Sequence, residues 1–307
     1  ISLEKFKPDF FLYENNKSMA PAIRAQITRE LGVDPILINS ALVSAQNRQR
    51  LYWTNIPGVE QPEDLGILLR DILESGVCWK EKAYTLRASA GEHQGMSNII
   101  RSITTNGKFG YLGAAEPVRI GTIESNAKNA DFDSQQYRVY SPDGKSVTLC
   151  GQGGGVGAKT GLYAVPVDGR FIISNSIAPN WKRYPVYVVR DGQITIKGEQ
   201  YPIKLADGLY IIRKLTVREC MRLQTVPEDY IFPVSDTQAY KMLGNGWTVD
   251  VIAHILHYAP GITTEPLEVL SMYDGMSCGR LALDELGAHI VHYCATEIDK
   301  YAVKTTQ

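Results

Sequence analysis

The sequence has few cysteines, and no two of them are spaced for metal binding. Five cysteines stand singly along 307 residues, and none forms the CxxC pair that structural zinc sites use. An odd and scattered set of thiols is typical of a reducing cytoplasm. We therefore expect neither a disulfide framework nor a metal site. The cysteines stand at positions 78, 150, 220, 278 and 294.

Long apolar runs and a net charge of one sign are also lacking. No run approaches the about 20 apolar residues of a membrane span, and no signal segment opens the chain, so we expect no membrane partner. The net charge of −1 gives no general attraction to nucleic acid, although a local basic cleft is invisible in a sum. A hydrophobic content of 44% and a charged content of 21% are typical of a globular protein.

The most informative stretch is Leu270–Gly279, near the C-terminus. An apolar run over Leu267–Tyr273 ends in a turn of small residues. Ser277 is placed to cap the following helix, and Gly287 is placed to end it. Strand, tight turn and helix in this order are typical of the opening of a nucleotide-binding βαβ unit.

A second apolar strand follows at Ile290–Thr296 and leads into Glu297. Gly275 and Glu297 lie 22 residues apart. An acidic side chain about 20 residues after a glycine turn, at the end of the next strand, is where such folds hold ribose hydroxyls. The pair predicts half of a site for an adenosine cofactor, and it leaves the type of cofactor open.

The rest of the chain predicts an α/β layer interrupted by a β-rich region. The first block alternates strand and helix, whereas residues 83–213 are rich in glycine, asparagine and serine and have no long helical periodicity. We expect the glycine-rich segment 152–157 to be a plain mobile loop, because it lacks the GK[ST] of a phosphate-binding loop. Expected strands are Pro8–Glu14, Pro35–Val43, Leu51–Thr54, Gly161–Val167, Tyr184–Arg190, Gln193–Ile196 and Gly208–Ile212.

Helices return after residue 213. Thr216–Glu219 has the sequence of a capping box, with Pro227 beyond the helix that it starts. A second helix is expected from about Asp236 to Gly244, and a third from about Thr248 to Tyr258.

Five short motifs resemble those of one family, although each alone has an ordinary alternative as a turn, a solvated strand face or a helix break. Glu14-Asn15 resembles the ENV motif of the cytosine-C5 DNA methyltransferases, and Gln46-x-Arg48-x-Arg50 resembles their QxRxR motif. The segment 238–246 resembles the QAYxxxGNS motif, the segment 273–279 resembles the FxGxG cofactor loop, and the segment 297–299 resembles the second cofactor motif.

The resemblance implies a methyltransferase α/β sheet of the S-adenosylmethionine-dependent, Rossmann-like class, with a β-rich target-recognition domain. The catalytic domain would cover 1–57 and 214–307, and the recognition domain would cover 58–213. The implied partner is double-stranded DNA, from which the target cytosine is flipped out. The implied location is the cytoplasm, for a protein encoded by a bacterium or a phage.

The resemblance also implies roles for individual residues. Glu14 and Asn15 would act at the target cytosine, with Arg48 and Arg50 fixing the base and the nearby backbone. The remaining positions would hold S-adenosyl-L-methionine: Tyr273, Asp274, Gly275, Met276, Ser277 and Gly279 in the loop, Glu297 at the ribose, Ile298 at the adenine, and Asn245 with Gly246 at the methionine end.

The sequence departs from the family in three ways. Ser277 replaces the second glycine of FxGxG, and Gly246 replaces the serine of GNS. No cysteine follows a proline, although the family's nucleophile lies in a Pro-Cys segment. The cofactor motif also comes last and the ENV motif first, so we expect a circularly permuted order in which the missing segment would join Gln307 to Ile1.

This departure leaves alternatives open. The chain as given would be inactive alone and would need a second polypeptide for the thiol. A gene fragment, a split enzyme and a tandem fusion all fit the order of motifs. A DNA-binding or regulatory subunit without catalysis, and an RNA cytosine methyltransferase of the same superfamily, are the functional alternatives.

Overall fold

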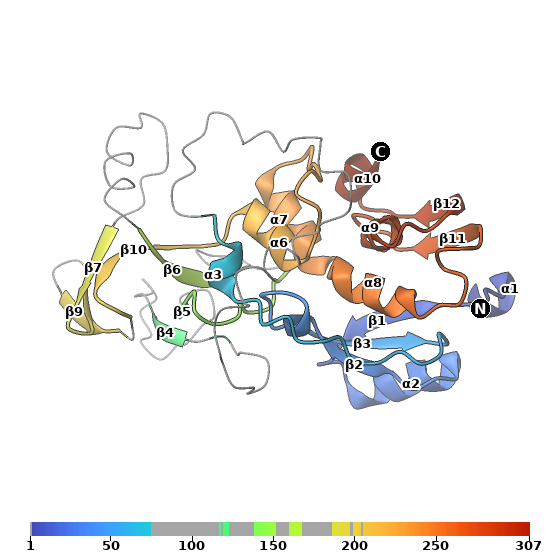
Figure 1. Cartoon of the computed structure of the whole chain (residues 1–307), viewed down its shortest axis with the longest axis horizontal. Helices are drawn as coiled ribbons and strands as arrows, with labels where there is room; N and C mark the ends of the chain where they lie inside the picture. Colours follow the sequence, from blue (N-terminus) through green and yellow to red (C-terminus); the bar gives the residue numbers. More distant parts are fainter. Residues whose placement is uncertain are drawn as a thin grey trace.

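The computed structural model describes residues 2–74, 117, 119–122, 138–151, 160–167, 186–196, 199–203 and 205–307. Within them two small sheets and six longer helices form one part of the molecule, and a third sheet forms the other (Figure 1). The glycine-rich segment 152–157 lies outside the described residues. No helix among the described residues is long and apolar enough to cross a membrane.

The first sheet has the strand order β1-β3-β2, in which β3 is antiparallel to both neighbours. Its strands are β1 (Leu12–Asn16), β2 (Ile36–Asn39) and β3 (Gln49–Thr54). The short α1 (Ser2–Phe6) precedes it, α2 (Pro21–Leu31) joins β1 to β2, and a 3-10 turn, η1 (Ser40–Leu42), follows β2. Gly32 ends α2 with φ 73°, as its position after the helix predicts.

The strand predicted at Pro8–Glu14 is shifted and less buried than expected. It begins at Leu12, and Tyr13 is 41% exposed. Among the described strands β1 pairs only with β3, so its outer edge is open. An apolar sequence indicated burial here, but a strand at a sheet edge loses the neighbour that would cover it.

The second sheet pairs β11 (Leu267–Met272) with β12 (Ile290–Thr296) in parallel. The helix α9 (Cys278–Glu285) connects them, and α10 (Lys300–Thr306) follows, with Asp299 as its N-cap. The predicted strand, turn and helix are therefore confirmed.

Three helices join the two sheets into one core. They are α6 (Val217–Leu223), α7 (Asp236–Asn245) and α8 (Val249–His257). Figure 1 shows α8 between β1-β3-β2 and β11-β12, and Val251, Ile252 and Ile255 of α8 are fully buried there. Burial on several sides is typical of a helix enclosed between layers. Leu256, expected on the buried side, is half-buried.

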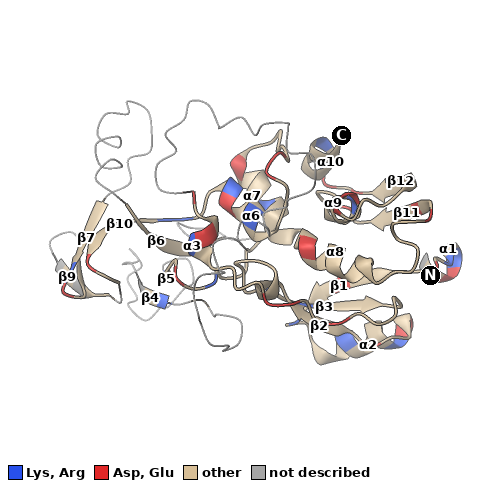
Figure 2. Cartoon of the chain, in the orientation of Figure 1, with Lys and Arg blue, Asp and Glu red and all other residues tan. Residues whose placement is uncertain are grey.

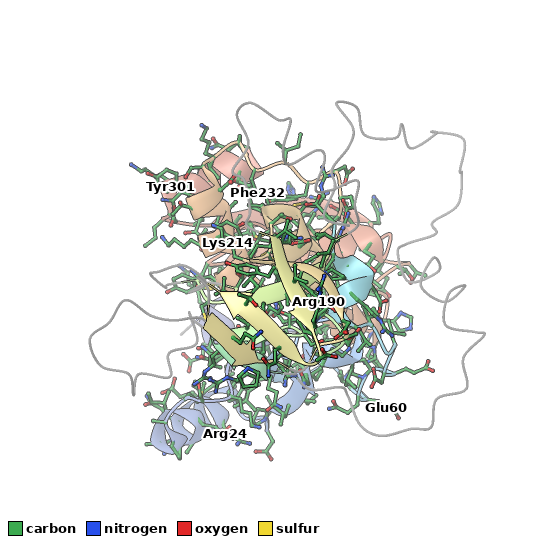
Figure 3. The ribbon with its side chains drawn as sticks, turned by 90° about the vertical axis from the view of Figure 1, so that its left-hand side faces the viewer. Arg24, Glu60, Arg190, Lys214, Phe232 and Tyr301 are labelled. Atoms are coloured by element: carbon green, nitrogen blue, oxygen red, sulfur yellow. The ribbon has the colours of Figure 1, made fainter. Side chains whose placement is uncertain are left out.

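The third sheet has seven strands in the order β4-β5-β6-β10-β7-β8-β9. It confirms the β-rich region predicted for the middle of the chain. Viewed from its own side, the sheet lies in front of the α/β part, with Arg190 near the centre of this view (Figure 3). The strands are β4 (Arg119–Thr122), β5 (Arg138–Tyr140), β6 (Leu162–Pro166), β7 (Val186–Arg190), β8 (Gln193–Ile196), β9 (Glu199–Pro202) and β10 (Gly208–Arg213).

A buried ion pair joins the end of β10 to α6. Both Arg213 nitrogens Nη1 and Nη2 donate to the Glu219 carboxylate at 2.7 Å, and the Glu219 side chain is 0% exposed. Glu219 also closes the predicted capping box with Thr216. On the other side, the short α3 (Leu69–Ile72) leads to Glu74, whose backbone N–H donates to Glu219 at 2.9 Å. One carboxylate therefore fixes both connections between the β-rich sheet and the helices.

Candidate functional site

Glu14 lies on β1 with one charged and one polar partner. Its Oε1 accepts a hydrogen bond from Arg50 Nε at 3.0 Å, and its Oε2 accepts one from the Trp247 indole N–H at 3.1 Å. Burial raises the pKa of Glu14 above its ordinary value, against the opposite effect of the Arg50 and Arg48 guanidiniums. A partly buried carboxyl with a raised pKa is suited to holding a proton against a ligand that presents a hydrogen-bond acceptor.

Asn15 does not join this cluster. Its Nδ2 donates to the Tyr13 hydroxyl at 3.3 Å, and its Oδ1 accepts from the Asn16 backbone N–H at 2.7 Å. Successive residues of a strand face opposite sides, so Asn15 points away from the side that Glu14 occupies.

Arg48 connects three backbone segments. It is 3% exposed, its Nη1 donates to the Leu149 carbonyl at 3.2 Å, and its Nη2 donates to the Gly244 carbonyl at 3.2 Å and the Gly246 carbonyl at 2.9 Å. Burial lowers the pKa of Arg48 to about 10, so the side chain remains charged near neutral pH. Of the two arginines, Arg50 therefore contacts Glu14, whereas Arg48 fixes the turn after α7.

A buried lysine supports the loop that leads to Arg48. Lys145 is 0% exposed, and its ammonium donates to the carbonyls of Ala41, Ser44 and Ile67. Burial lowers the pKa of Lys145 to about 8. Gln46 is also fully buried, and its side-chain amide has no hydrogen-bond partner among the residues that the structure describes.

Asp274 organises the glycine turn after β11. Its carboxylate accepts hydrogen bonds from the Tyr293 hydroxyl at 2.6 Å and from the hydroxyls of Ser271 and Ser277. Ser277 is the residue before α9, as predicted, but it has φ 58° and no side-chain cap bond. The predicted cap is therefore wrong in detail, because the Ser277 hydroxyl is used to hold the turn through Asp274.

Glu297 closes the same turn from the end of β12. Its Oε2 accepts from the Gly275 backbone N–H at 2.7 Å, and its Oε1 accepts from the backbone N–H groups of Ile298 and Asp299, both at 2.7 Å. Gly275 has φ 58°, a conformation that favours glycine. The spacing of 22 residues read from the sequence thus becomes a direct contact.

Two apolar side chains stand exposed beside this turn. Tyr273 is 82% exposed and Ile298 is 94% exposed. The carboxylate of Glu297 retains lone pairs for hydroxyl donors, and the two apolar side chains offer surfaces for a flat ring. This donor and surface chemistry fits an adenosine group.

Gly246 brings the turn after α7 against the cofactor-type loop. A Cβ built on Gly246 would lie 3.1 Å from the Met242 carbonyl oxygen and 3.3 Å from both Cys278 Sγ and Met276 Sδ. Met276 and Cys278 are buried. The two departures from the family pattern, glycine at 246 and the sulfur-bearing residues around 277, therefore meet in space. Gly279, at the start of α9, faces the Trp247 ring, which lies 3.6 Å from a Cβ built there.

Asn245 is exposed at the end of α7 and lies against Gly151. A Cβ built on Gly151 would come within 1.8 Å of Asn245 Oδ1, and one built on Gly244 would come within 2.4 Å of the Cys150 carbonyl carbon. The segment before the glycine-rich loop therefore packs directly on this turn. Asn245 contacts that segment, and Gly246 contacts Met276 and Cys278.

Sequence analysis missed three residues that tie the site together. Trp247 contacts Glu14, Tyr230 donates through its hydroxyl to the Met276 carbonyl at 2.9 Å, and Lys241 pairs with Asp299 at 2.8 Å. Their partners are distant in sequence, so no local pattern marks them. A group of His, Cys, Asp and Glu side chains that could hold a metal is absent from the described part of the chain.

The fold and the site define a class. An α/β core with a glycine turn, and an acid on the next strand that bonds to it, is the arrangement of proteins that bind nucleotide-like cofactors. The family model of the C-5 cytosine-specific DNA methylases matches residues 2–259. The chain therefore belongs to this family. The match covers Glu14, Arg48, Arg50 and the turn at Gly244–Gly246, and it ends before β11.

Curated relatives are type II methyltransferases. The chain is 62% identical over 40 residues to the type II methyltransferase M.SsoII of Shigella sonnei, which is 13% of this chain and 11% of that protein. It is 38% identical over 92 residues to M.HpaII of Haemophilus parainfluenzae, 30% of this chain and 25% of that protein. The matched segments thus span from about a tenth to a quarter of these relatives.

Solved structures are similar at a lower level. The S. pombe Dnmt2 methyltransferase aligns with a TM-score of 0.40 and 15% identity, over 82% of this chain and 65% of that one.

Proposed function

We propose that this chain is a DNA (cytosine-5)-methyltransferase polypeptide. It would transfer a methyl group from S-adenosyl-L-methionine to a cytosine flipped out of double-stranded DNA. The observation that carries the proposal is the cluster of Glu14, Arg50, Arg48 and the Gly244–Gly246 turn, which lies against the loop containing Met276. Family membership supplies the reaction class.

Glu14 is the residue for the target base. A flipped cytosine presents a ring nitrogen that accepts hydrogen bonds and an exocyclic amine that donates them. The raised pKa of Glu14 favours a carboxyl that can supply a proton to the ring nitrogen as charge builds on the base. Arg50, bonded to the other oxygen, keeps this carboxyl oriented.

The loop from Tyr273 to Gly279 and the Glu297–Ile298 pair would hold the cofactor, which supplies an electrophilic methyl group when bound. Gly275 lets the backbone approach closely, Glu297 accepts ribose hydroxyls, and Ile298 with Tyr273 covers the adenine. Asn245 and Gly246 would lie toward the methionine end. Figure 2 shows acidic and basic positions interspersed over the described elements, so specific contacts rather than a general field would attract the ligands.

Binding of the cofactor is tested with S-adenosylhomocysteine and isothermal titration calorimetry. Glu297→Ala should lose most of the affinity, because it removes both the ribose acceptor and the contact that fixes Gly275. Glu268→Ala is the matched control, since Glu268 is an exposed acid on β11 outside the loop, and its affinity should be unchanged. DNA binding that persists without any cofactor binding would favour the regulatory-subunit alternative.

The second part of the proposal concerns the thiol. Transfer to C5 of cytosine requires a thiolate that adds to C6, and no cysteine of this sequence follows a proline. We infer that a second polypeptide carries the Pro-Cys segment. The chain alone should give no methyl transfer to duplex DNA of mixed cytosine contexts, and a polypeptide with that segment should restore it. Robust turnover by the chain alone would refute this part, and turnover on tRNA in place of duplex DNA would favour the RNA alternative.

A further inference from the structure

Trp247 contacts both halves of the proposed site. Its indole N–H donates to Glu14 Oε2 at 3.1 Å, across 233 residues of sequence. Its ring lies 3.6 Å from a Cβ built on Gly279, in the first turn of α9. Its backbone N–H also donates a hydrogen bond to the thiol of Cys278, the first residue of α9. One residue therefore links the carboxyl on β1 to the helix that follows the cofactor-type loop.

The backbone of Trp247 is fixed on both sides. The carbonyl of Gly246 accepts from Arg48 at 2.9 Å, and the Gly246 N–H donates to Met242 at 2.7 Å. Thr248, on the other side, is 1% exposed and bonds through Oγ1 to the Gln224 side chain at 2.8 Å. A side chain on a backbone held in this way has little freedom to move when its contacts change.

The indole contact is directional. Glu14 Oε1 is bonded to Arg50, so Trp247 supplies the donor on Oε2 and thereby determines the rotation of the carboxyl about its last torsion. Packing alone does not require this hydrogen bond, because the Glu14 side chain is 16% exposed and water could reach it.

We propose that Trp247 is a positioning residue for methyl transfer, which orients the Glu14 carboxyl and couples that orientation to the position of the cofactor loop. The inference rests on the proposed function for the identity of the two ligands. Its structural part, the control of Glu14 by the indole N–H, stands independently of them.

The charged surroundings predict a measurable sign. The hydrogen bond from Trp247 lowers the pKa of Glu14, together with the Arg50 and Arg48 guanidiniums, against burial, which raises it. Tyr52, the cross-strand neighbour of Glu14, also lies close enough for their charges to interact. Removing only the indole N–H should therefore raise the pKa of Glu14 further.

The experiment is a titration of the Glu14 side-chain carboxyl in the full chain by carbon-13 NMR, assigned with Glu14→Gln. Trp247→Phe should move the titration midpoint to higher pH. A second variant carries 3-benzothienylalanine at position 247, which keeps the shape of the indole and replaces its N–H with sulfur, and it should give the same shift. An unchanged midpoint in the benzothienylalanine variant would overturn the orienting role.

The coupling is tested by adding S-adenosylhomocysteine to the same samples. The Glu14 carboxyl resonance should shift in the unsubstituted chain and shift less in both variants. Equal shifts in all three would overturn the coupling. If the unsubstituted chain does not bind S-adenosylhomocysteine, the proposed function and with it the coupling fail, whereas the titration still decides the orienting role.

Trp53→Phe is the matched control. The Trp53 indole N–H donates to Thr28 Oγ1 at 2.9 Å, and the side chain is 0% exposed, so the same chemical change is made at a donor that does not contact Glu14. This variant should lower the thermal midpoint but leave the Glu14 titration where it is. A Glu14 shift equal to that of Trp247→Phe would show that any loss of packing moves the carboxyl, which would contradict the proposal.

Discussion

At the scale of single residues, the site depends on close contacts that leave no room for a side chain at Gly246. The Met242 carbonyl oxygen and the sulfur atoms of Met276 and Cys278 surround the position that a Cβ would take. The family pattern has serine here, so this chain combines a smaller residue at 246 with larger residues in the loop that faces it.

Gly246→Ser should therefore destabilise the chain. The added Cβ would lie 3.1 Å from a backbone oxygen, and overpacking of a tight core costs about 1–3 kcal/mol. The measurement is the free energy of unfolding from urea titration. Cys278→Ala in the same chain should recover part of the loss, because it removes one of the two sulfurs at 3.3 Å, and a double-mutant cycle isolates that coupling. Strict additivity of the two changes would contradict the packing argument.

A second residue-scale prediction concerns Asp250 on α8. Burial, and secondarily the Glu285 carboxylate, raises the pKa of Asp250 to about 7 from an ordinary 3.8. The folded chain therefore binds this proton more tightly than the unfolded chain, and the stability contributed by the site is lost as pH rises from about 4 to about 7.

Asp250→Asn removes this loss. Relative to the unsubstituted chain, the variant should gain on the order of 1–3 kcal/mol between pH 5 and pH 8. Urea midpoints at the two pH values measure the difference. A gain that is the same at both pH values would show that titration of Asp250 is not its cause.

At the scale of elements, the joint between β10 and α6 depends on a single carboxylate. Glu219 accepts two hydrogen bonds from Arg213 and one each from the backbones of Glu74 and Thr216. Removing one partner of a buried pair leaves an uncompensated charge, which costs about 3–5 kcal/mol.

Glu219→Ala should thus destabilise the chain by this amount. The loss should also loosen the seven-stranded sheet relative to the helices, which limited proteolysis can detect. The matched control is Arg218→Ala on the same helix. Arg218 is 50% exposed and pairs with Glu74 and Glu228 at 3.7 and 3.6 Å, so its loss should cost at most about 1 kcal/mol. Similar effects of the two variants would contradict the assignment of the joint to Glu219.

At the scale of the whole molecule, two sheets on one core helix have open edges. Among the described strands β1 pairs only with β3, and β11 pairs only with β12, while Leu270 and Met272 of β11 are 39% and 46% exposed. An open strand edge with apolar side chains is suited to pairing with a further strand. The second polypeptide inferred above would carry such a strand.

Hydrogen exchange tests this arrangement. The outward backbone N–H groups of β1 and β11 should exchange fast in the chain alone, and a polypeptide with the Pro-Cys segment should slow that exchange at least tenfold. The outer edge of β2 serves as an internal control, because it is open in the same way but lies on the far side of its sheet. Protection of β2 to the same extent, or none at β1 and β11, would rule out strand pairing there.

The sequence alone determined the elements and the chemistry that is local. Apolar runs, the capping box at Thr216 and the glycine at 32 specify strands and helix ends through contacts of a few residues. The spacing of Gly275 and Glu297 specified their contact, because a βαβ unit brings the ends of parallel strands together. The motif at Gln46–Arg50 indicated a polar site, since charges rarely interrupt a buried strand without one.

Only the tertiary structure decided how these parts are shared among roles. Arg48 and Arg50 are two residues apart, yet one holds three carbonyls and the other pairs with Glu14. Trp247 reaches Glu14 across the core, and β1 became an open edge in spite of its apolar sequence. These outcomes depend on contacts between segments up to 233 residues apart, and no local pattern carries that information.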